Sequence, residues 1–146
     1  MAFTKEYARK IILSLDGVRK TERAQRTIYD KAFDKPTNVT DLTDGLSNVA
    51  GILGLIFLTS TATGVATGVF SIVAMLAPSE KDDLQDMVYE GYWNLGYLED
   101  FLDHHPEYDL IEVNFPFIEY ETQGVRFITG KGAVTRVHSG SGWILL

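Results

Sequence analysis

The stretch "GILGLIFLTSTATGVATGVFSIVAMLA", residues 51–77, contains no charged side chain. It lies within a longer uncharged run from Gly45 to Ser79. A helix that is apolar on all sides is covered either by protein or by lipid. The fold therefore depends on what surrounds this run, and the flanking sequences supply the first evidence.

Charge is divided unevenly between the two flanks of the 146-residue chain, whose net charge is −7. Residues 1–44 carry nine Lys/Arg against seven Asp/Glu, whereas residues 80–146 carry four against thirteen. A net negative charge argues against a nucleic-acid partner, which requires a basic face. The absence of cysteine excludes disulfides and thiolate metal sites. The first residues lack the uninterrupted apolar segment of a Sec-type signal peptide, so we expect none.

The N-terminal flank predicts an amphipathic, basic helix over residues 4–35. Its apolar residues recur at helical spacing from residue 11 to residue 32, Thr4 is a candidate cap, and Lys35-Pro36 is expected to end the helix. Arg19, Arg23 and Arg26 form a stripe along it. Two interpretations fit this stripe: a solvated face with ion pairs to Glu22 and Asp30, or a contact with anionic lipid or an acidic partner.

The uncharged run itself predicts a bent pair of helices, an apolar Gly/Ala-rich hairpin within residues 40–78. The sequence "TSTATG" is the expected bend, leaving arms at residues 49–58 and 64–77. Each arm is shorter than the roughly 20 residues that a membrane-spanning helix needs. A single tilted helix of about 22 residues is the alternative.

Small residues are spaced along this run in a pattern typical of close helix packing. Ser60, Gly64 and Gly68 lie four residues apart and include a GxxxG motif, which lets a second helix approach closely. The candidate membrane or oligomer contacts are Gly51, Gly54, Ile56, Phe57, Ser60, Gly64, Gly68 and Phe70.

The C-terminal flank predicts one helix followed by short strands. Residues 79–105 have apolar residues at intervals of three or four, after Ser79 as the expected cap. The positions expected to face the core are Leu84, Val88, Gly91, Leu95, Leu98 and Leu102. Residues 109–146 alternate between apolar and polar and are divided by glycine turns, which predicts an antiparallel meander of three or four strands. The whole chain is expected to be a single α+β domain.

The segment "EDFLDHHPEYD", residues 99–109, is the one group of side chains with metal-ligand chemistry. Its spacing matches no metal or acid–base motif, and its position at a helix end gives the two histidines a structural role beside the carbonyl dipoles. We therefore predict no catalytic site, no metal and no cofactor, and expect a protein that is not an enzyme.

An apolar, Gly/Ala/Thr-rich hairpin between amphipathic helices resembles small α-helical pore-forming toxins and the hydrophobic hairpins of colicin-type channel domains. The resemblance covers roughly residues 40–104 and is one of architecture. It implies a membrane-associated protein that reaches lipid from a soluble form and assembles as a homo-oligomer. The alternative is a soluble interaction module or assembly subunit in which the hairpin stays buried, with a protein partner that the sequence does not identify.

Overall fold

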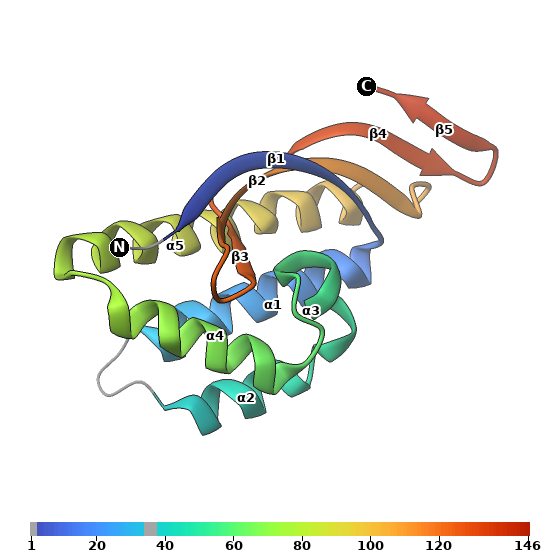
Figure 1. Ribbon diagram of the computed structural model, residues 1–146. Helices are drawn as coiled ribbons and strands as arrows, with labels where there is room; N and C mark the ends of the chain where they lie inside the picture. The colour runs from blue at the N-terminus through green and yellow to red at the C-terminus, as the bar shows by residue number, and fades with distance from the viewer. Residues whose placement is uncertain (1–2, 34–37) are drawn as a thin grey trace.

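The computed structural model describes residues 3–33 and 38–146, and in these residues an arched sheet lies over a group of helices (Figure 1). The helices of the described chain are α1 (Leu15–Ala32), α2 (Val39–Ser47), α3 (Ala50–Phe57), α4 (Ala62–Met75) and α5 (Pro78–Asp103). The strands are β1 (Thr4–Leu13), β2 (Leu110–Tyr120), β3 (Val125–Ile128), β4 (Ala133–Ser139) and β5 (Gly142–Leu145). The predicted α+β class is confirmed.

The prediction of a helix is wrong for residues 4–13, because they form β1. This strand pairs antiparallel with the whole of β2, from Thr4 opposite Tyr120 to Leu13 opposite Ile111. Charged side chains on β1 suit the free edge of a sheet, where they discourage pairing with other chains. The helix starts only at Leu15, after Ser14 accepts a hydrogen bond from the backbone N–H of Gly17. The predicted helix end at Lys35-Pro36 lies outside the described residues.

The sheet is built on β2, which is shared by three strands. One edge of β2 pairs with β1, and the other edge pairs with β3 near Tyr120 and with β4 near Leu110. β5 then pairs with β4 and forms the far edge. Four strands follow residue 109 as predicted, but their order is not that of a simple meander, because β4 returns to β2 rather than to β3.

The longest helix, α5, buries the face that its sequence predicts. All six predicted core positions from Leu84 to Leu102 are buried. The predicted serine cap is wrong: Ala77 is the N-cap, Pro78 follows it, and the side chain of Glu80 accepts a hydrogen bond from the backbone N–H of Ala77. Proline fits this first position because its missing N–H would have no partner in the helix.

The uncharged run forms two helices, α3 and α4, that are bent by 48° relative to each other. The predicted break is confirmed, since α3 ends at Phe57 and Leu58 has a φ of 74°. Thr61 then caps α4 by accepting a hydrogen bond of 3.0 Å from the backbone N–H of Gly64. Two short helices, rather than one continuous helix, therefore carry the apolar sequence. A bend of 48° is far smaller than the reversal of direction that the predicted hairpin requires, and the segment predicted from residue 40 begins with the separate helix α2.

Gln25 connects α1, α5 and the sheet through its buried amide. It donates to the carbonyl oxygens of Val88 (3.1 Å) and Ile128 (2.6 Å) and accepts from the backbone N–H of Ile128 (3.1 Å). These bonds satisfy backbone groups of β3 that have no strand beyond them. Gly91 of α5 lies against the same carbonyl, so helix and strand meet without an intervening side chain.

Candidate functional site

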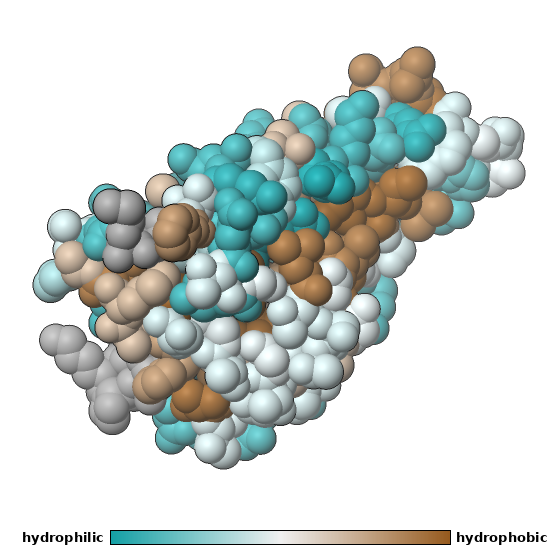
Figure 2. Space-filling model, in the orientation of Figure 1, coloured by the Kyte–Doolittle hydropathy of each residue, from teal (hydrophilic) through white to brown (hydrophobic). Residues whose placement is uncertain are grey.

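The exposed surface of α3 and α4 carries no charge. Its large apolar side chains are Leu55 (48% exposed), Leu58, Phe70 (41% exposed) and Met75. Small or hydroxylated residues lie between them: Gly51, Ser60, Thr61, Thr63, Thr67, Ser71 and Ala74. In Figure 2 the surface over α4 is largely pale, whereas the hydrophilic colour gathers over the sheet. We call these residues the uncharged face, and it is the candidate site on this side of the molecule.

The predicted membrane or oligomer contacts do not share one surface. Ile56 and Phe57 are completely buried in the core of the chain. Gly51, Ser60 and Phe70 are exposed on the uncharged face. The prediction thus combined core residues with surface residues, because α3 is apolar on both sides and its sequence does not distinguish them.

The GxxxG pair packs within the chain. A Cβ atom on Gly68 would lie 2.7 Å from Cγ2 of Val125 on β3, so the small residue admits a strand rather than a second helix. A Cβ atom on Gly64 would lie 2.5 Å from Cγ2 of Thr59, in the turn before α4. A Cβ atom on Gly54 would lie 3.2 Å from Cβ of Ser60, which is a looser but still tight contact, and of these four glycines Gly51 alone has open space around it. Three of the four glycines therefore serve packing inside this fold.

Gly68→Leu is expected to lower the free energy of unfolding by about 1–3 kcal/mol, because the new side chain would overpack the contact with Val125. Urea denaturation measures the change. Thr67→Leu is the matched control, since Thr67 precedes it on α4 and is exposed. Equal stabilities of the two variants would show that the close contact between Gly68 and β3 is unimportant.

A buried arginine, which the sequence did not single out, holds the end of α3. Arg126 on β3 donates from Nε to the carbonyl of Ile56 (2.8 Å) and from Nη2 to that of Leu55 (2.9 Å). Its Nη1 donates to the hydroxyl of Tyr7 (3.0 Å), and its guanidinium lies 3.9 Å from the ring centre of Phe117. A cation at a helix C-terminus is favourable because it meets the free carbonyls and the negative end of the helix dipole. Arg126 therefore attaches α3 to the sheet.

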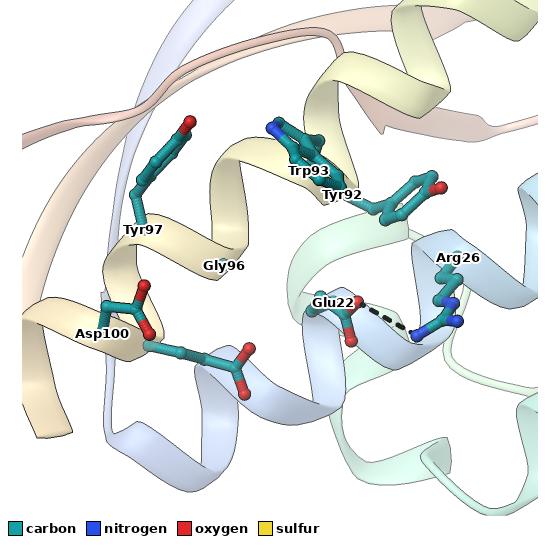
Figure 3. A pocket seen from close by; sticks show the side chains of 8 residues that line it. Glu22, Arg26, Tyr92, Trp93, Gly96, Tyr97 and Asp100 are labelled. Atoms are coloured by element: carbon teal, nitrogen blue, oxygen red, sulfur yellow. Dashed lines mark ion pairs between the residues drawn. The ribbon is translucent and has the colours of Figure 1, made fainter.

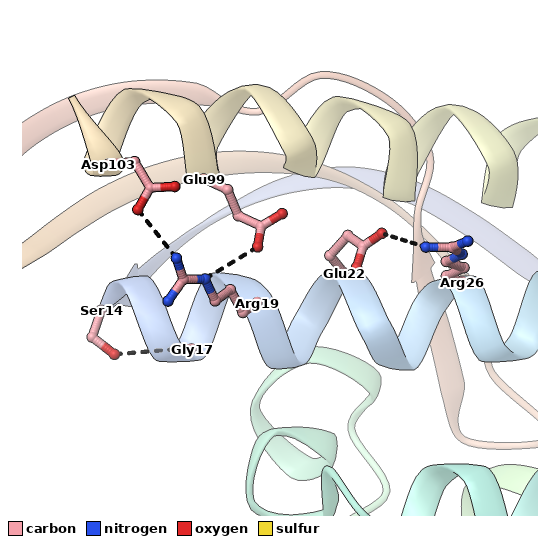
Figure 4. A network of polar contacts seen from close by, with 7 residues as sticks. All are labelled: Ser14, Gly17, Arg19, Glu22, Arg26, Glu99 and Asp103. Atoms are coloured by element: carbon pink, nitrogen blue, oxygen red, sulfur yellow. Dashed lines mark hydrogen bonds and ion pairs between the residues drawn. The ribbon is translucent and has the colours of Figure 1, made fainter.

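The arginine stripe of α1 is divided between two roles (Figure 4). Arg19 contacts two acidic residues of α5, Glu99 at 3.5 Å and Asp103 at 3.1 Å. Arg26 pairs within α1 with Glu22 and Asp30, both at 4.0 Å, which confirms the ion pairs of the solvated-face interpretation. Arg23 is exposed and has no ion-pair partner within 4 Å in the described part of the chain. A lipid or acidic contact of the stripe stays a prediction.

The acidic, histidine-containing segment after α5 is held by local contacts. His104 donates from Nδ1 to the carbonyl of Asp100 (2.7 Å), which caps the helix as expected. His138 on β4 lies 2.7 Å from Asp109, and this hydrogen bond holds the pKa of the Asp109 carboxyl below its usual value. In residues 3–33 and 38–146 no three acidic or histidine side chains gather closely enough to hold a metal ion.

Comparisons with known proteins found no family model, no curated protein and no solved structure that matches the chain. Within the described residues, no single helix has both the length and the apolar character to cross a bilayer. α3 and α4 meet the length and composition requirements when they are taken together as a bent pair.

Proposed function

We propose that the protein is a non-enzymatic, membrane-active protein that meets lipid through the uncharged face of α3 and α4. The observation that carries the proposal is the absence of charge over this whole face, together with its exposed apolar residues Leu55, Phe70 and Met75. A charged side chain costs several kcal/mol to bring into hydrocarbon, whereas threonine, serine and glycine cost far less. In the folded state, this face can therefore enter a membrane interface without burying a charged side chain.

Deeper insertion requires α3 to leave its place in the core. Ile56 and Phe57 would have to exchange the protein interior for lipid, and the carbonyls of Leu55 and Ile56 would lose the guanidinium of Arg126. The proposal therefore has two stages: contact of the intact fold through the uncharged face, and then release of α3 with oligomerisation in the membrane. The resemblance to pore-forming toxins belongs to the second stage.

Co-sedimentation with anionic liposomes, at neutral and at mildly acidic pH, tests the proposal. We expect the protein to enter the pellet only when lipid is present, because pelleting without lipid would indicate aggregation. A protein that stays in the supernatant as a stable monomer at both pH values would overturn the proposal.

Leu55→Glu is expected to reduce the liposome-bound fraction at least tenfold, because it places a carboxylate on the uncharged face. The effect on folding stability should be small, since Leu55 is half exposed. Ile12→Glu is the matched control: Ile12 is a similarly exposed apolar residue, but it lies on β1. Equal losses of lipid binding in both variants would mean that the added charge acts through general repulsion.

A second candidate is a soluble interaction module in which α3 and α4 never leave the protein. Its support is the depth of the contacts that hold them: Ile56 and Phe57 are fully buried, and Gly68 lies against β3. In that case the uncharged face binds another protein. Stable folding without lipid, together with indifference to liposomes, is the outcome that would favour this candidate.

A further inference from the structure

A pocket of about 390 Å³ lies between α1 and α5 (Figure 3), and none of its lining residues belongs to the uncharged face. Its aromatic lining comes from α5 and includes Trp93 and Tyr97. Its charged lining comes from both helices and consists of Glu22, Arg26, Glu99 and Asp100. The volume falls in the usual range for small-molecule sites, about 300–1,000 Å³.

The aromatic wall consists of two largely exposed side chains. Trp93 is 54% exposed and Tyr97 is 58% exposed, which is unusual for side chains of this size. They are four residues apart, so they share one side of the helix. Gly96 lies between them and has no atom within 4 Å of the place where a Cβ would stand, which keeps the space open. Tyr89 stacks on Trp93 with an angle of 9° between the rings and supports its orientation.

The charges of the pocket are unbalanced toward the negative. Three carboxylates line the pocket with one guanidinium, that of Arg26, which contacts Glu22 and Asp30 only at 4.0 Å. Glu99 is already paired with Arg19 from outside the lining, at 3.5 Å. Asp100 has no ion-pair partner within 4 Å among the residues that the structure describes. Burial raises the pKa of the Glu22 carboxyl, and the neighbouring Glu99 raises it further. Asp100, and Glu22 with its 4.0 Å ion pair, are therefore the carboxylates of the pocket that the protein's own cations neutralise least.

We propose that this pocket binds an organic cation, an alkylammonium or guanidinium group such as a lysine or arginine side chain or a polyamine carries. The electron-rich faces of Trp93 and Tyr97 attract a cation, and its alkyl part packs on the same rings. The carboxylates of Asp100 and Glu22 supply the charge-assisted hydrogen bonds. An inorganic cation should bind this pocket more weakly, because its tightly bound hydration shell keeps it away from the aromatic rings.

The fluorescence of Trp93 reports binding directly in a Trp143→Phe background, in which it is the only tryptophan left. The probes are spermidine, representing a free polyamine, and acetyl-Gly-Lys-Gly-amide, representing a protein side chain. Potassium chloride at matched ionic strength is the reference. We expect a saturable change in emission with at least one organic probe, and the probe that binds more tightly identifies the source of the cation. The measurement contains no lipid, so its result is independent of the proposed membrane function.

Four variants in this background test the geometry. Tyr97→Leu and Asp100→Asn should each weaken binding about fivefold, whereas Arg26→Gln should strengthen it by removing the competing cation. Asp86→Asn is the matched control, because Asp86 is exposed on the same helix and does not line the pocket. No saturation with either probe, or equal weakening by Asp86→Asn and Asp100→Asn, would overturn the proposal.

Discussion

Gly91→Ala is expected to lower the free energy of unfolding by at least about 3 kcal/mol, which is more than overpacking usually costs. A Cβ atom at this position would lie 2.1 Å from the carbonyl oxygen of Ile128 and 2.0 Å from Nε2 of Gln25. The first of these is backbone in β3, so it cannot turn aside. Relief requires α5 and β3 to separate, and this removes the buried hydrogen bonds of Gln25 as well.

Gly96→Ala on the same helix is the control for this substitution. Nothing lies within 4 Å of the added methyl group, so only helix propensity changes, and stability should rise by up to about 1 kcal/mol. Urea denaturation of both variants gives the two free energies. If Gly91→Ala is also neutral or stabilising, then the close approach of Ile128 to α5 does not exist in solution.

The same glycine shows how far the sequence carries a prediction. Spacing alone placed Gly91 on the buried face of α5, together with five larger apolar residues, and the structure confirms all six positions. Periodicity identifies a face because it depends on the helix itself. It does not reveal what meets that face. The carbonyl of Ile128 and the amide of Gln25 come from segments far away along the chain, so their contact with Gly91 required the fold.

The wrong assignment of residues 4–13 has a related cause. Ile11, Ile12 and Leu15 fit a helical stripe, and the strand signal of β1 is weak because its first seven residues include four charged ones. Pairing with β2 along its full length decides the conformation instead. The sequence signal for the true start of α1 is Ser14, whose side chain caps the helix by accepting a hydrogen bond from the backbone N–H of Gly17.

The candidate sites were predictable only in part. The absence of charge in residues 45–79 is visible in the sequence, but its division into a buried side and an uncharged face is not. The role of Arg126 could not be predicted, because it lies in a short strand with no motif around it. Its partners at the end of α3 are backbone carbonyl groups, which every residue has and which the sequence therefore does not mark. The pocket between α1 and α5 likewise needs both helices to be placed.

Arg126→Met is expected to lower the free energy of unfolding by about 3 kcal/mol, because it leaves two carbonyls at the end of α3 without a donor. Methionine retains contact with Phe117, so the loss reports the hydrogen bonds rather than a cavity. Arg126→Lys keeps the charge, but its single ammonium group cannot reach three acceptors at once. Its free energy of unfolding should therefore lie between those of the wild type and Arg126→Met. Arg9→Met is the control, since Arg9 is exposed and lies over the same Tyr7 ring.

The same variant also tests the second stage of the proposed function, the release of α3. If α3 must be released before it enters a membrane, then Arg126→Met removes the contact that opposes release, and dye leakage from anionic liposomes should rise while stability falls. Arg9→Met should change neither quantity. If Arg126→Met loses stability as expected and yet causes no more leakage than the wild type, the release of α3 has no part in function. Lipid contact would then be limited to the first stage, through the uncharged face of the intact fold, with Arg126 fixing α3 permanently to the sheet.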